Sequence, residues 1–104
     1  MKLSNTETIA NQTISETLGI ARGSTVRSRN IGRDIFASLK NIVGGEIEEY
    51  TKLQADAREQ ALKRMISDAQ RLGADAVVNV RFTTSVMAQG ASEMLAYGTA
   101  VKLK

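Results

Sequence analysis

The sequence predicts an α+β fold of 104 residues, with a mostly antiparallel sheet and two helices on one of its faces. Two observations lead to this prediction. Near both ends of the chain, apolar and polar residues alternate as in half-buried strands. In the middle, apolar residues recur at steps of three and four, as in amphipathic helices. No internal repeat, low-complexity stretch or linker divides the sequence, so 1–104 is expected to form a single domain.

The first strand region covers residues 7–28. Leu18 and Ile20 have the spacing of a strand with one buried face, but Gly19 and Gly23 interrupt the pattern. Glycine inside a strand indicates a bulge, a bend or the close approach of another backbone. The region is therefore predicted to form one or two bent strands.

Two helices follow. The first begins near Asn30, whose side chain can cap a helix, and ends at Gly44-Gly45. The second covers about 46–72, carries charged residues on its outer face and ends before Gly73. The first helix has a stripe of Ile31, Ile35, Leu39 and Ile42 or Val43; the second has Ala57, Ala61, Leu62, Met65 or Ile66, Ala69 and Leu72.

The chain ends in two strands. Residues 76–84 alternate, which places Val78, Val80 and Phe82 on one face and Val77, Asn79 and Arg81 on the other. Residues 85–92 are expected to be a turn, and 93–103 form the last strand. One face of that strand carries a row of small residues, Ala96, Gly98 and Ala100, which permits very close packing by a helix or a neighbouring subunit.

Composition excludes much of the usual chemistry. The chain has no Cys, His, Trp or Pro and only two Phe and two Tyr. Disulfides, thiolate nucleophiles and imidazole bases are therefore absent, no Gly-x-Ser-x-Gly motif occurs, and we expect neither an enzyme nor a cofactor. The core must be aliphatic, rich in Ala and thin, which favours self-association. The polar N-terminus and the lack of a run of about 20 apolar residues predict a cytoplasmic protein without a membrane span.

The net charge of +3 is concentrated near the N-terminus. Residues 1–45 hold six basic and three acidic groups, whereas 46–104 hold eight of each. Arg27, Arg29 and Arg33 lead into the first helix, where guanidinium groups and free helix amides could hold a small anion; the alternative is an ordinary solvated loop. Aromatic platforms beside these arginines are lacking, so nucleic-acid binding is not expected.

The carboxylates offer one local cluster, Glu46, Glu48 and Glu49. It is interpreted as a solvated helix N-terminus, because acidic side chains there are stabilised by the helix dipole. No loop of alternating Asp and Asn surrounds it, so no metal site is predicted.

Several segments, taken in order, resemble the YbjQ-like family of small bacterial and archaeal proteins, which are uncharacterised and labelled as heavy-metal-binding. They are DIFASLKNIVGG at 34–45, Tyr50, Ala57-Arg58, LGADAVV at 72–78 and YGTAV at 97–101. The resemblance implies a homopentamer whose sheets join around an axis in a barrel-like ring, and it implies no catalytic residue. Some relatives have a cysteine and many have acidic residues along the third strand, where this chain has Arg81 and Thr83.

The resulting hypothesis is a non-enzymatic homopentamer that binds a small anion near Arg27, Arg29 and Arg33. The alternative is a metal-binding or metal-handling protein. Without His and Cys, it would have to use carboxylate and backbone oxygens.

Overall fold

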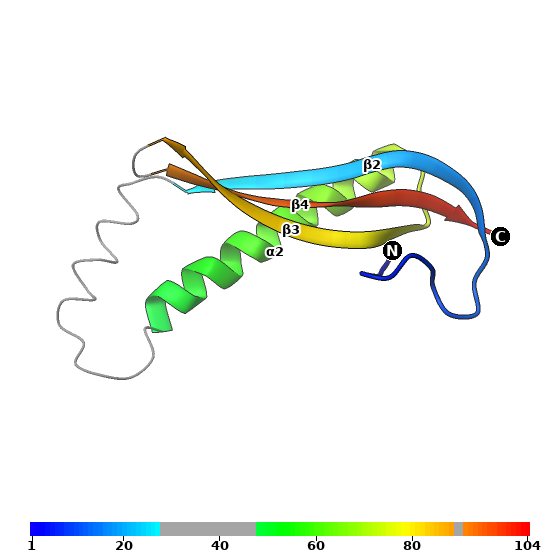
Figure 1. Cartoon of the computed structure of the whole chain (residues 1–104), viewed down its shortest axis with the longest axis horizontal. Coiled ribbons are helices and arrows are strands. Elements are labelled where there is room, and N and C mark those ends of the chain that lie inside the picture. Colours follow the sequence, from blue (N-terminus) through cyan, green and yellow to red (C-terminus); the bar gives the residue numbers. More distant parts are fainter. Residues whose placement is uncertain (28–47, 89–90) are drawn as a thin grey trace.

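The computed structural model describes residues 1–27, 48–88 and 91–104. These residues form a four-stranded sheet with a helix lying diagonally across one face (Figure 1). The strands follow the order β1-β3-β4-β2 across the sheet. The elements are β1 (Lys2–Leu3), β2 (Ile14–Arg27), α2 (Glu48–Arg71), β3 (Ala76–Ala88) and β4 (Ala91–Leu103).

The predicted α+β class and the mostly antiparallel sheet are confirmed. Strand β4 pairs antiparallel with both β2 and β3, and the short β1 runs parallel to β3. Only α2 is described as a helix; the other predicted helix, about 31–43, lies outside the described residues. The barrel-like ring is not a property of the single chain, because the described strands form an open sheet.

The hairpin between β3 and β4 is longer than the sequence predicts. Residues 85–92 were expected to be a turn, but β3 continues to Ala88 and β4 already begins at Ala91. Ser85 pairs with Glu93 and Val86 with Ser92. The additional strand residues lie beyond the part of the sheet that α2 covers. Few apolar residues are buried there, so the alternation that predicts a half-buried strand is missing from the sequence.

Glycine has two different roles in β2. Gly19 has a φ of 130° and lies where the register of β2 against β4 shifts, so it forms the bulge that bends the strand. Gly23 lies beneath α2. A Cβ atom there would lie 2.5 Å from the Ala61 carbonyl oxygen and closer still to the Met65 amide nitrogen. Both roles proposed for strand glycines, bulge and close approach, occur.

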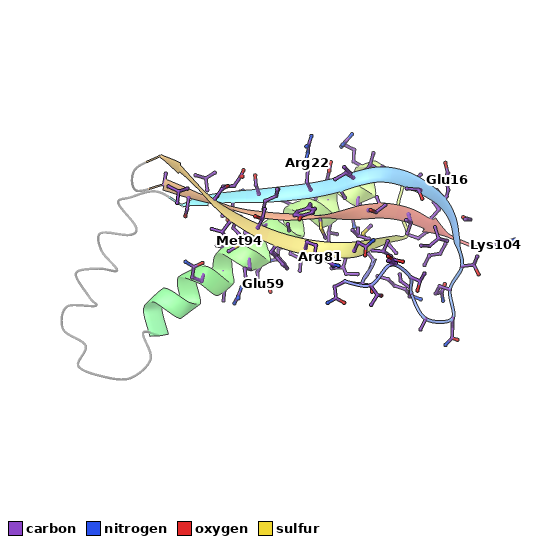
Figure 2. The ribbon with its side chains drawn as sticks, viewed as in Figure 1. Glu16, Arg22, Glu59, Arg81, Met94 and Lys104 are labelled. Carbon is purple, nitrogen blue, oxygen red and sulfur yellow. The ribbon has the colours of Figure 1, made fainter. Side chains whose placement is uncertain are left out.

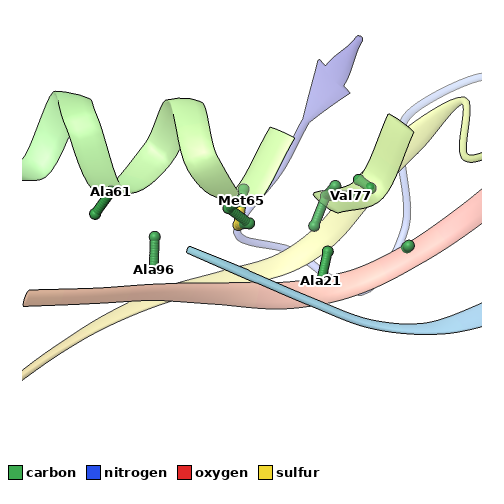
Figure 3. Packing of buried hydrophobic residues seen from close by; sticks show 7 residues of the cluster. Ala21, Ala61, Met65, Val77 and Ala96 are labelled. Atoms are coloured by element: carbon green, nitrogen blue, oxygen red, sulfur yellow. The ribbon is translucent and has the colours of Figure 1, made fainter. Parts of the chain in front are cut away.

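The main core lies between α2 and the sheet. Ala57, Ala61, Met65 and Ala69 follow one another at steps of four residues and are all buried. Their partners are small, which allows the helix to lie close to the strands (Figure 3). The core is thus aliphatic and rich in Ala, as predicted. The sheet contributes Ala21, Val77, Ala96 and Ala100, while Leu62, Ile66 and Leu72 pack around the margin.

The end of α2 agrees with the sequence. Gly73 has a φ of 81°, and the Ala74 amide donates to the Ala69 carbonyl at 3.0 Å. This left-handed glycine closes the last helical turn and allows the chain to enter β3.

A second, smaller core lies on the other face of the sheet. Ala76, Val78 and Val101 are buried there, and Ile9, Ile14 and Leu103 pack against them. The segment before β2 therefore covers one end of this face. Beyond it lies the open face, which we define as the part of the sheet opposite α2 that carries Ile20, Arg22, Arg81, Leu95 and Tyr97.

A bulge in β3 changes which residues face the helix. Val78 pairs with Thr99, but the next paired residue is Arg81 with Tyr97, so β3 holds one extra residue. Asn79 adopts a φ of 54°, which asparagine tolerates better than most residues. The predicted alternation is therefore wrong beyond Asn79: Arg81 shares a face with Val78 rather than with Val77.

Candidate functional site

The described surface offers strand edges and a broad sheet face as candidate sites. Large apolar side chains are exposed on both. Val86 is 80% exposed and Ile20 is 69% exposed, and Val26, Phe82 and Tyr97 are exposed as well. Exposed apolar groups concentrated on strands of one sheet are typical of an interaction surface.

The outer edge of β2 is closed in its middle by two side chains of α2. The Arg22 amide donates to Asp68 Oδ2 at 3.0 Å, and Arg64 donates to the Ser24 carbonyl at 2.5 Å. An edge strand leaves such backbone groups free to pair with another chain. These two bonds therefore protect the centre of the β2 edge and tie the helix to it.

Asp68 also forms an ion pair within α2. Its Oδ1 accepts from Arg71 Nη2 at 2.7 Å and from Nε at 3.3 Å. The hydrogen bond from Arg71, followed by that from the Arg22 amide, holds the pKa of the Asp68 carboxyl below its usual value. The carboxylate is thus favoured in the folded chain, where it connects the helix, the edge strand and Arg71.

Removing the Asp68 charge is expected to weaken the fold modestly. Asp68→Asn should lower the free energy of unfolding by about 1 kcal/mol near neutral pH, because a charge-assisted hydrogen bond is lost from a partly exposed group. The folded-state pKa is the lower one, so this contribution is complete above about pH 4 and fades as the pH falls through the folded-state value. Urea unfolding at neutral and acid pH should show the variant and wild type converging in acid.

Asp56→Asn is the matched control, since Asp56 is an exposed acid on the same helix. It should change the free energy of unfolding by less than about 0.5 kcal/mol. A constant difference between Asp68→Asn and wild type at all pH values would contradict the assigned role of the carboxylate.

The outer edge of β3 is protected only at its beginning. Lys2 and Leu3 of β1 pair with Ala76 and Val77. The Asn79 and Val80 amides then donate to carbonyls of the N-terminal segment, at Thr6 and Ser4 respectively. From Phe82 to Ala88, no strand pairs with this edge in the described part of the chain. A long stretch of backbone groups is therefore available there.

The predicted anion site cannot be assembled from the described residues. The backbone of Arg27 ends β2 opposite Ser92, but its side chain is not described. Arg29 and Arg33 lie outside the described residues altogether. The site formed by these three arginines stays a prediction.

The residues do not fit a site for a soft heavy metal. The sequence supplies neither thiolate nor imidazole, so its four Met thioethers are the soft donors left for such ions. Within 1–27, 48–88 and 91–104, the structure brings no three acidic side chains together as possible ligands. The side chains of the Glu46, Glu48 and Glu49 cluster are not among those described.

The contacts of Arg64 and Asp68 with the edge of β2 could not be predicted from the sequence. Both lie on the charged side of a helix, where side chains are usually solvated. Their partners in β2 are backbone atoms that lie 46 and 40 residues earlier in the sequence. The sequence carries no local signal for such long-range contacts. In the described part of the chain, no helix is long and apolar enough to cross a membrane.

The fold and its exposed edges define a small α+β protein built around an open sheet. The chain belongs to the YbjQ family: the family model described as "Putative heavy-metal-binding" matches residues 1–104. A "UPF0145 protein" of Halorubrum lacusprofundi is 60% identical over 104 residues and is covered completely, as is this chain. A "UPF0145 protein" of Archaeoglobus fulgidus is 60% identical over 102 residues, which cover 98% of this chain and 94% of the relative.

A solved structure shares the fold at low sequence identity. It is a protein of unknown function from Pediococcus pentosaceus, assigned to the DUF74 family, which is 13% identical to this chain. The match has a TM-score of 0.66 and covers 100% of this chain and 98% of the other. The names of the two relatives give no activity, and the solved structure shows the fold alone.

Proposed function

We propose that this protein is a non-enzymatic subunit of a homo-oligomeric ring, and that the pentamer implied by the family resemblance is its working form. The observation that carries the proposal is the free edge of β3 from Phe82 to Ala88, with exposed Phe82 and Val86 beside it. Such an edge is a template for pairing or packing with another chain. A second copy of the chain is the occupant we propose.

The two long outer strands favour a closed ring over a simple pair. The free edge of β3 and the partly protected edge of β2 lie on opposite sides of β4. A contact between two different surfaces is heterologous, and repeated copies of it form a ring when the rotation closes. The protected centre of β2, with its bonds to Asp68 and Arg64, would limit edge pairing there and help to fix the register.

The thin core supports the same proposal. Most of the fully buried side chains are Ala or Val, and Met65 is the largest of them. Each Ala buries little apolar area, so the isolated subunit gains little from its core. Contact between subunits would add apolar burial at Phe82 and Val86. Metal handling stays the alternative, but no arrangement among the described residues favours it.

Charge placed on the β3 edge should prevent assembly. In Phe82→Lys/Val86→Lys, each contact would lose the apolar area of two side chains and would have to desolvate two lysine charges. We expect wild type to appear as a pentamer in native mass spectrometry and light scattering, and the variant to appear as a folded species of lower mass. Circular dichroism checks that the variant keeps its secondary structure.

Gln70→Lys is the control, because it adds a positive charge at an exposed position on α2. It should assemble like wild type. A stable, folded wild-type monomer at micromolar concentration would contradict the proposal, as would an assembled double-lysine variant.

A further inference from the structure

The outer edge of β2 carries a row of backbone groups that point away from the sheet. In an antiparallel pair, alternate residues direct both their N–H and their C=O away from the partner strand. The Arg22 amide and the Ser24 carbonyl bond to side chains of α2 rather than to β4, so these two residues point outward. The alternation gives Ile20 and Val26 the same direction. Such a row is what an added strand pairs with.

Asp68 and Arg64 occupy the middle of this row in the way that a neighbouring strand would. A carboxylate oxygen takes the place of a strand carbonyl at the Arg22 amide, and a guanidinium takes the place of a strand amide at the Ser24 carbonyl. The two residues lie one helical turn apart, so a single element supplies both. Figure 2 shows the Arg22 side chain on the outer side of β2, away from β4, which adds a further charge to this edge.

These two side chains, which we call the edge guard, are held firmly. Arg71 donates to Asp68 Oδ1 at 2.7 Å, which fixes the carboxylate while Oδ2 accepts from the Arg22 amide at 3.0 Å. The bond from Arg64 to β2 is also charge-assisted, and such bonds are stronger than those between neutral groups. A strand that added to the middle of β2 would have to displace both contacts.

The outer edge of β3 has a similar row of backbone groups. Strand β4 directs its backbone groups alternately to β2 and to β3, which makes Phe82, Thr84 and Val86 the residues that point outward from β3. In the described part of the chain, no strand pairs with these groups. The two long outer strands therefore differ, because the middle of β2 is occupied by the edge guard and the end of β3 is open.

The segment 82–88 has the composition of a strand that pairs between chains. Its sequence, FTTSVMA, contains aromatic and β-branched residues but no charged residue, no Gly and no Pro. Uncharged segments of about six or seven residues with high β-propensity are the ones that add to strands of other chains. A second copy of the chain thus supplies a strand suited to the β2 edge.

We propose that the β2 edge is a strand-addition site that Arg64 and Asp68 keep closed, and that the segment 82–88 of a second copy is the strand it takes when the edge guard is absent. Pairing of β3 along an unguarded β2 is a heterologous contact, and copies joined by such a contact add one after another when the rotation does not close. The edge guard therefore prevents growth of an extended sheet. The proposal uses the β3 edge of the proposed assembly, but the guard acts whether or not wild type closes into a ring.

The test compares wild type with Arg64→Ala/Asp68→Ala, which opens the edge and leaves the net charge unchanged. At micromolar concentration we expect light scattering to show an average mass several-fold above that of wild type and rising with time. Thioflavin T fluorescence should rise with the mass, because the dye reports extended sheets. Adding Thr84→Pro should stop the growth, because proline removes an outward N–H from the added strand without adding a charge.

Two controls separate an open edge from lost charge and from lost stability. Asp56→Ala/Arg58→Ala removes the same two kinds of charge from exposed positions of α2. Ile66→Val trims a residue at the margin of the core that forms neither edge bond. Growth is compared with urea added so that the variants have equal unfolded fractions, and circular dichroism before growth checks that each is folded. Both controls should keep the mass of wild type.

Three results would overturn the proposal: a wild-type mass for Arg64→Ala/Asp68→Ala, growth that persists when Thr84→Pro is added, or equal growth of Ile66→Val. The ring is judged separately, from the mass of wild type itself. A wild-type monomer would contradict the ring but not the edge guard, because the growth of the variant is measured relative to wild type.

Discussion

Gly23→Ala is expected to abolish folding or to lower the free energy of unfolding by about 3 kcal/mol or more. The added Cβ would meet backbone atoms of α2 at Ala61, Arg64 and Met65. Backbone atoms cannot rotate away as the end of a side chain can, so the helix would have to move off the sheet. Overpacking a core commonly costs about 1–3 kcal/mol, and a shift of the whole helix places this variant at or above the upper end.

Urea denaturation followed by circular dichroism measures the effect. Ser24→Ala is the control at the next residue of β2, since the known contact of Ser24 uses its backbone carbonyl. It should stay within about 0.5 kcal/mol of wild type. Equal stability of Gly23→Ala and wild type would show that α2 does not approach β2 as closely as described.

The close approach at Gly23 shows what the sequence can predict. A glycine within a strand pattern indicated a bulge, a bend or the close approach of another backbone, and the row of Ala96, Gly98 and Ala100 indicated close packing by a helix or a neighbouring subunit. The period of the apolar residues also identified α2 and the paired strands. Both signals are local: each depends on residues within one element. The class of fold and the Ala-rich core could therefore be predicted.

Features that depend on register could not be predicted in this way. The bulge at Asn79 adds one residue to β3, and from that point the two faces of the strand are exchanged. Alternation alone gives the faces only while the pairing continues without a shift. That Tyr97 pairs with Arg22 on one side and with Arg81 on the other is visible only once this register is known. Strand β1 was also missed, because two residues are too few to show a period.

The same small residues connect the core, the surface and the proposed assembly. Alanine and glycine let α2 lie close to β2 and β4, but the helix then covers only part of the sheet. Phe82 and Val86 at one end of β3 stay exposed, and Ile20 and Tyr97 are exposed on the opposite, open face. A chain with larger core residues would hold its helix farther away and gain more from its own core.

Met65→Ala is expected to lower the free energy of unfolding by about 2–5 kcal/mol, the usual range for a large-to-small change in a core. Met65 is fully buried and is the largest of the fully buried side chains between α2 and the sheet. Its neighbours Ala21, Ala61 and Ala96 are too short to fill the space that it would leave (Figure 3).

Met65→Leu is the matched control, because it keeps the volume nearly constant and should cost less than about 1.5 kcal/mol. Denaturant titration measures the free energy of unfolding of both variants. The protein concentration is chosen so that wild type is in a single state of assembly. If Met65→Ala and Met65→Leu were equally stable, the contact between α2 and the sheet would not supply the main stabilising burial of this chain. The stability would then have to come from elsewhere, with contacts between subunits as the first place to look. The concentration dependence of the Met65→Ala transition would reveal that contribution, since assembly makes the unfolding midpoint rise with protein concentration.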